Sequence, residues 1–197
     1  MKKDIILAGV GGQGILSIAA AIGLAAVESG LYLKQAEVHG MSQRGGDVQS
    51  HLRLSDKEIA SDLIPQGKAD MIISVEPMEA LRYLPMLSGE GWIITNTKPF
   101  INIPNYPDYN ELILEIEKQP KQISFDADKI AKDLHSPKSA NMVILGAASP
   151  FLDIEYSKLE NAVKKLFGRK GEDIIRKNLD ALKAGRAFAE KNIPVIV

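Results

Sequence analysis

A glycine-rich turn near the start of the chain has the spacing of a phosphate-binding loop. Gly9-x-Gly11-x-x-Gly14 follows a short apolar run and precedes a stretch with the composition of a buried helix. Glycine permits positive φ and a close approach of the backbone, so amides at a helix N-terminus can face an anion. Alternatively, the glycines only let the helix pack tightly on the sheet. The candidate binding residues of this turn are Gly9, Gly11, Gly12, Gln13 and Gly14.

An acidic residue completes the formal pattern of a dinucleotide-binding fold. Glu37 comes 23 residues after Gly14, at the end of a predicted second strand. A dinucleotide fold places its ribose-binding carboxylate near this point. The pattern therefore allows a stand-alone NAD- or flavin-binding dehydrogenase, while the alternative is that Glu37 is a solvated strand end.

A second loop dense in polar residues follows at once, in Glu37-Val-His-Gly-Met-Ser-Gln-Arg-Gly-Gly46. Hydroxyl, amide and guanidinium donors at the carboxyl end of a strand would lie at the usual ligand crevice of an open α/β sheet. The guanidinium of Arg44 suits a phosphate or a carboxylate. The alternative is a plain hairpin loop with Gly45-Gly46 as turn residues and Arg44 in water. The candidate residues of this loop are His39, Ser42, Gln43, Arg44, Gly45 and Gly46.

Other kinds of site find little support in the sequence. The chain has no cysteine, which excludes disulfides, thiolate nucleophiles, Cys-ligated zinc and Cys-ligated iron–sulfur clusters. If electrons pass through this system, another chain carries the cluster. The three histidines, His39, His51 and His135, show no paired metal-ligand spacing, so we expect no metal site.

Composition narrows the class of protein. A length of 197 residues favours a single domain over 1–197, since domains typically have roughly 100 to 200 residues. Lys and Arg number 24 against 25 Asp and Glu, so no basic excess favours nucleic acid or anionic membrane. Asp4 and several glycines interrupt the apolar stretch after Lys2-Lys3, and no run has the ~18 apolar residues of a membrane span. We expect a cytoplasmic protein.

The elements that must position these loops alternate between strand and helix. We expect an α/β fold with a mostly parallel, Rossmann-like sheet, helices on both faces and a helical C-terminal end. Residues 48–54 alternate with period two, which predicts a half-buried strand at an antiparallel edge or in a hairpin. Ser157-x-x-Glu160 predicts a capping box. Strands are expected at 4–8, 31–37, 48–54, 69–75, 92–95 and 122–125, and helices at 15–27, 77–84, 126–134, 139–148, 157–167 and 172–191.

Taken together, the glycine turn, the block from Glu37 to Gly46 and the following Ser50-His-Leu-Arg-Leu54 resemble the gamma domain of the 2-oxoacid:ferredoxin oxidoreductases. Within that group the sequence looks most like the beta subunits of the indolepyruvate enzymes. The similarity spans essentially the entire chain, including Ser139-Ala-Asn-Met-Val-Ile-Leu-Gly146. His-Gly-Met-Ser-Gln-Arg-Gly-Gly is far more specific than a lone glycine motif.

The resemblance implies an accessory subunit of an enzyme that oxidatively decarboxylates aryl 2-oxoacids to acyl-CoA and reduces ferredoxin. It also implies that thiamine diphosphate and iron–sulfur clusters belong to a larger alpha subunit, which agrees with the absence of cysteine here. Under this resemblance the glycine turn serves CoA phosphates or domain packing rather than NAD. A non-catalytic scaffold subunit is a further alternative.

Overall fold

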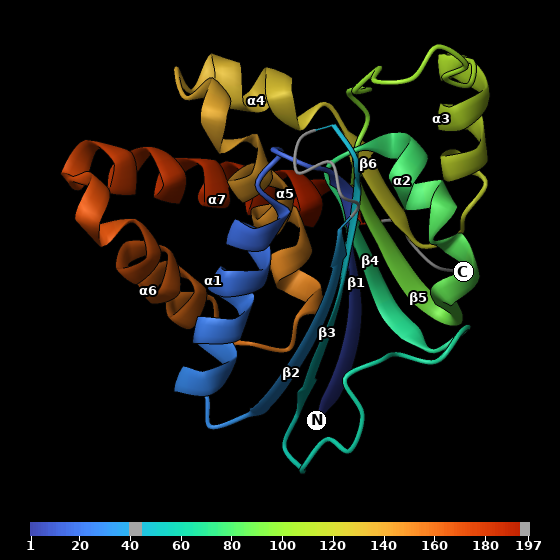
Figure 1. Cartoon of the computed structure of the whole chain (residues 1–197). Coiled ribbons are helices and arrows are strands. Elements are labelled where there is room, and N and C mark those ends of the chain that lie inside the picture. Colours follow the sequence, from blue (N-terminus) through green and yellow to red (C-terminus); the bar gives the residue numbers. More distant parts are fainter. Residues whose placement is uncertain (40–44, 194–197) are drawn as a thin grey trace.

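In the computed structural model, which describes residues 1–39 and 45–193, six strands form one sheet in the order β2-β3-β1-β4-β5-β6 (Figure 1). The pairs β1–β4, β4–β5 and β5–β6 are parallel. Strand β3 pairs antiparallel with both β2 and β1. The strands are β1 (Lys2–Val10), β2 (Tyr32–His39), β3 (Asp47–Ser55), β4 (Ala69–Ser74), β5 (Leu87–Asn96) and β6 (Gln122–Phe125).

Helices cover both faces of this sheet (Figure 1). One face carries α1 and the C-terminal helices α4 to α7, and the other carries α2 and α3. This arrangement confirms the predicted fold class, including the helical C-terminal end. The helices are α1 (Ile15–Glu28), α2 (Pro77–Arg82), α3 (Tyr109–Glu117), α4 (Ala127–Asp133), α5 (Ala140–Ala148), α6 (Tyr156–Phe167) and α7 (Glu172–Asn192).

The central strand β1 divides the core between the two faces. Because side chains alternate along a strand, Ile5 and Leu7 join the large apolar cluster beneath α1 and α5, while Ile6 packs with Ile64 and Ile72 on the opposite face. Burial of each such side chain contributes roughly 1.5 to 3 kcal/mol. Burial on both faces explains why residues 4–8 read as an unbroken apolar run.

The position of β3 corrects the sequence-based expectation for residues 48–54. The strand is a hairpin partner of β2, as expected, but it lies inside the sheet between β2 and β1 and is mostly buried. Its alternating polar residues are matched by partners instead of water. Arg53 forms a two-pronged ion pair with the buried Asp4, at 2.8 and 3.1 Å, and His51 Nδ1 accepts the Ile64 N–H at 3.0 Å. An alternating pattern therefore does not establish an edge strand.

The observed helices also differ from the expected ones at two points. Helix α3 was not expected, although Asp108, whose carboxylate accepts the amides of Asn110 and Glu111, is an ordinary N-cap signal. The predicted capping box at Ser157 is wrong, because α6 begins one residue earlier and Ser157 Oγ donates to Glu155 Oε1 at 2.5 Å. Among the described residues, no helix has both the length and the apolar composition needed to span a membrane.

Candidate functional site

The glycine turn connects the buried end of β1 to the start of α1. Gly12 and Gly14 have φ angles of +103° and +82°, a region that side chains with a Cβ disfavour. Gly14 is the N-cap of α1, and no side chain caps that helix. Its carbonyl accepts the Asn141 Nδ2–H at 3.1 Å, which joins the starts of α1 and α5. The backbone conformation at positions 12 and 14 therefore favours glycine.

Gln13 is part of the internal structure of the turn. Its Oε1 accepts the Val10 N–H at 2.8 Å, and its Nε2 lies 3.5 Å from the Val75 carbonyl oxygen at the end of β4. The side chain thus connects the ends of two neighbouring strands. This geometry gives Gln13 a positioning role in the candidate site.

The structure brings the two predicted loops together. The Gly11 N–H donates to the Gly46 carbonyl at 2.8 Å, and the Gly45 N–H donates to the Gly11 carbonyl at 3.2 Å. Asn102 Nδ2, from the segment after β5, donates to the Gly45 carbonyl at 2.6 Å. Three segments far apart in sequence therefore meet at one edge of the sheet.

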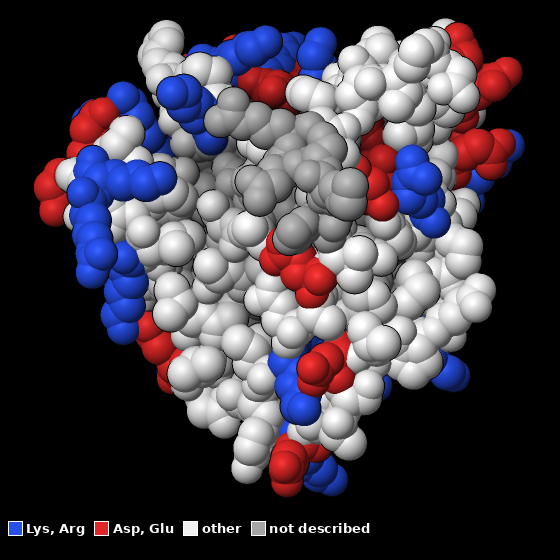
Figure 2. Space-filling view, viewed as in Figure 1, with Lys and Arg blue, Asp and Glu red and all other residues white. Residues whose placement is uncertain are grey.

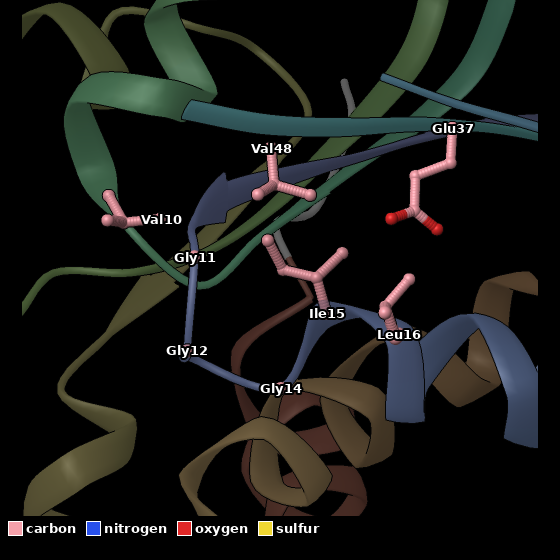
Figure 3. Close-up of a pocket in the computed structure, with 8 residues that line it drawn as sticks. All are labelled: Val10, Gly11, Gly12, Gly14, Ile15, Leu16, Glu37 and Val48. Atoms are coloured by element: carbon pink, nitrogen blue, oxygen red, sulfur yellow. The ribbon is translucent and has the colours of Figure 1, made fainter. Parts of the chain in front are cut away.

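A cavity of about 410 Å³ lies beside the glycine turn, between α1 and the first strands (Figure 3). In Figure 3 the side chains of Ile15, Leu16 and Val48 point into it, and the carboxylate of Glu37 is directed toward the start of α1. Most of the wall is apolar. The cavity can take an apolar or planar group, with the carboxylate of Glu37 available to accept hydrogen bonds. Its lining is Val10, Gly11, Gly12, Gly14, Ile15, Leu16, Glu37 and Val48.

The placement of Glu37 differs from that in a dinucleotide fold. In such a fold the acidic residue ends a strand next to β1, whereas here β3 lies between β2 and β1. Neighbouring strands are about 4.8 Å apart, so the extra strand moves Glu37 outward by about that distance. The nominal fingerprint therefore does not produce the usual ribose-binding geometry.

Several predicted residues of the second loop lie outside the described part of the chain. These are Ser42, Gln43 and Arg44, together with the intervening Gly40 and Met41. His39 ends β2, and Gly45 and Gly46 precede β3.

A buried carboxylate that sequence reasoning missed supports this edge of the sheet. Glu76 has no exposed surface and accepts hydrogen bonds from Glu79 N at 2.9 Å, Phe100 N at 3.2 Å and the Tyr106 hydroxyl. It thereby holds the segment 97–107, whose Asn102 binds the second loop. Burial and the nearby Glu76 carboxylate raise the pKa of Tyr106 above its usual value. The position of Glu76, two residues after the buried strand β4, is the sequence signal for such a residue.

A second cluster of carboxylates lies at the start of β3. The Tyr83 hydroxyl donates to Asp47 at 2.7 Å, and Arg82 pairs with the buried Glu79 at 2.7 Å. Burial raises the pKa of Glu79 to about 7, and the neighbouring Asp47 acts in the same direction against the effect of Arg82. Within the described ranges, no group of three or more His, Asp or Glu side chains is arranged to hold a metal ion.

Comparison with known proteins places this geometry in a family. Residues 4–188 match the family described as pyruvate ferredoxin/flavodoxin oxidoreductase, which is nearly the whole chain. The chain belongs to that family. The resemblance stated from the sequence motifs is therefore confirmed.

Relatives within the pyruvate ferredoxin/flavodoxin oxidoreductase family match along most of their length. The indolepyruvate oxidoreductase subunit IorB of Archaeoglobus fulgidus is 37% identical over 194 residues, with 94% of each chain covered. The IorB subunit of Pyrococcus horikoshii is 36% identical, with 91% of this chain and 94% of the relative covered.

Solved structures share the fold at lower identity. The 2-oxoglutarate:ferredoxin oxidoreductase from Magnetococcus marinus, with 2-oxoglutarate, coenzyme A and succinyl-CoA bound, superposes with a TM-score of 0.78 at 23% identity. The match covers 98% of this chain and 32% of that one, so this fold is about a third of the longer chain. The gamma subunit of a keto/oxoacid ferredoxin oxidoreductase from Geobacter sulfurreducens gives 0.69 at 23% identity, covering 96% and 99%.

Proposed function

We propose that this chain is the accessory beta subunit of an indolepyruvate:ferredoxin oxidoreductase. The complete enzyme oxidatively decarboxylates aryl 2-oxoacids to acyl-CoA and carbon dioxide and passes two electrons to ferredoxin. The observation that carries this proposal is the near full-length identity of 36–37% to two IorB subunits. We treat residues 1–197 as one gamma-type domain, which the family match over 4–188 supports.

The chemistry of this chain requires a partner for that reaction. Without cysteine it offers no thiolates for an iron–sulfur cluster, so the electron path to ferredoxin lies in another subunit. We assign thiamine diphosphate and the clusters to a larger alpha subunit. Ferredoxin then binds the assembled complex, and this chain contributes part of the binding surface of that complex.

The cavity beside the glycine turn is the proposed binding site for part of CoA. Backbone amides at the uncapped start of α1 favour a phosphate group, while the apolar wall suits the organic part of the ligand. Glu37 is placed to accept a hydrogen bond from a hydroxyl group. The second loop contributes Gly45 and Gly46 through their bonds to Gly11. His39, Ser42, Gln43 and Arg44 stay in the proposal on sequence grounds.

Reconstitution tests the subunit assignment. We expect the pure chain to be colourless and unable to oxidise indolepyruvate, and to give CoA-dependent ferredoxin reduction only with a large partner subunit. Co-purification from the native host identifies that partner, and absorbance and turnover assays check the two states. We expect weak or absent NADH binding by calorimetry. Oxoacid oxidation by the pure chain, or NADH affinity in the low micromolar range, would contradict the proposal.

Arg44 is the residue of the second loop whose side chain we would test first. Losing a charge-assisted contact costs on the order of 1.5 to 3 kcal/mol. This corresponds to roughly a tenfold to hundredfold loss of apparent affinity for CoA or for the partner. We therefore expect Arg44→Ala to keep its melting temperature while turnover of the complex falls at limiting CoA or subunit concentration. Wild-type turnover at every concentration would remove Arg44 from the site.

A further inference from the structure

A second cavity, of about 460 Å³, lies on the other flank of the glycine turn. Gly12, Gly14 and Ser17 form one wall of it, and the segment 135–139 and the start of α7 form the others. Its lining includes Lys138, Lys170 and Lys177 and contains no Asp or Glu. Unlike the apolar cavity that contains Glu37, this one is positively charged.

The charges of this lysine cavity are largely uncompensated. Within the described residues, Lys138 and Lys170 form no ion pair, while Lys177 pairs with Asp173 at 2.5 Å. Figure 2 shows Lys and Arg side chains gathered along the flank where α4, α6 and α7 lie in Figure 1. Because the whole chain has a net charge of −1, this concentration of positive charge is local.

Backbone amides add to the positive potential of the lysine cavity. The 14-residue α1 and the nine-residue α5 both begin at its wall, neither is capped by a side chain at its N-cap, and neither has an acidic residue in its first turn. The positive ends of both helix dipoles therefore lie beside the lysines. The bond from Asn141 Nδ2 to the Gly14 carbonyl fixes the two helix starts relative to each other.

We propose that the lysine cavity binds the phosphate groups of a small polyphosphorylated molecule. Ammonium groups bind phosphate as point charges, and backbone amides at helix starts donate to its oxygens. A concave site of this volume fits a small anion. The proposal goes beyond the subunit assignment, because neither an oxoacid nor a partner subunit takes part in it, although it shares the start of α1 with the proposed CoA site.

The experiment measures binding of inorganic pyrophosphate to the full chain alone by calorimetry at low salt. We expect saturable binding that weakens as salt is added, because exposed charges are screened. Replacing Lys138 and Lys170 together by glutamine should raise the Kd for pyrophosphate at least tenfold, since each loses a charge-assisted contact. The matched control, Lys68→Gln with Lys183→Gln, removes two exposed lysines outside the cavity and should leave the Kd within about twofold.

Ser17→Asp separates binding from folding. Position 17 is in the first turn of α1, where a carboxylate favours the helix dipole, so the melting temperature should stay the same or rise. The same carboxylate faces the lysine cavity and should abolish pyrophosphate binding. A parallel titration with ATP distinguishes a nucleotide, which would bind more tightly than pyrophosphate, from a free polyphosphate.

Loss of binding in the Lys138/Lys170 and Ser17 variants, with unchanged melting temperatures and an unaffected control, supports the proposal. Absence of saturable binding to the wild-type chain overturns it. Equal losses in the control variant also overturn it, because they would show a general effect of charge. Reconstitution of the wild-type chain with the large subunit has a separate readout, so the subunit assignment and the lysine-cavity proposal can fail independently.

Discussion

Replacing Gly185 with alanine is expected to destabilise the protein by about 3 kcal/mol or more. Gly185 lies in α7 where that helix crosses α5, and a Cβ there would fall on the carbonyl oxygen of Val143. A Cβ at Gly146 of α5 would likewise fall on the carbonyl oxygen of Leu182. Because both obstacles are backbone atoms, the helices must move apart. The gain of about 1 kcal/mol in helix propensity from Gly to Ala is smaller than this cost.

Thermal unfolding checks this prediction, since 1 kcal/mol shifts Tm by about 2 to 4 °C in a chain of this size. We expect Gly185→Ala and Gly146→Ala each to lower Tm by about 6 to 12 °C. Gly168→Ala is the matched control, because Gly168 has helical backbone angles and open space where a Cβ would lie. A Tm within 2 °C of the wild type for Gly185→Ala would show that α5 and α7 separate at little cost.

These glycines mark the limit of what the sequence predicts about the fold. The apolar patterns of 139–148 and 172–191 predict two helices, and the structure contains both, as α5 and α7. The same patterns do not predict which helix packs against which. In the sequence, a glycine inside a helix indicates only a residue of low helix propensity. The glycines are explained by the backbone of the neighbouring helix, which leaves no room for a Cβ. Similarly, residues 48–54 predict a strand but not its insertion between β2 and β1.

The candidate site likewise has one part that the sequence predicts and one part that it does not. The glycine turn and the following helix were predictable, because their geometry depends on residues near in sequence. The contacts that fix the turn were not, because their partners are distant: Asn141 is 127 residues from Gly14, and Asn102 is 57 residues from Gly45. No local sequence pattern marks these two asparagines as contacts of the site. Only the folded topology brings them to the edge of the sheet.

Gly14→Ala is expected to reduce turnover of the reconstituted complex by about tenfold to hundredfold at limiting CoA, a result that depends on the proposed function. The φ angle of +82° costs alanine about 1 to 2 kcal/mol, and its Cβ would lie 2.5 Å from Asn141 Nδ2. Asn141 must then move and lose its bond to the Gly14 carbonyl. A shift of about 1 Å in a binding element can cost on the order of 100-fold in rate.

Gly30→Ala supplies the matched control, because Gly30 has a similar φ of +73° but open space around its Cβ position, and it lies beyond the other end of α1. Both variants should lose about 1 to 2 kcal/mol of stability from backbone strain, yet only Gly14→Ala should lose turnover. Adding Asn141→Ser to Gly14→Ala removes the obstructing amide and should recover part of that turnover. If Gly14→Ala and Gly30→Ala give the same turnover at every CoA concentration, the glycine turn serves packing alone. The CoA site must then lie elsewhere, because a turn that tolerates a displaced helix start does not position a ligand.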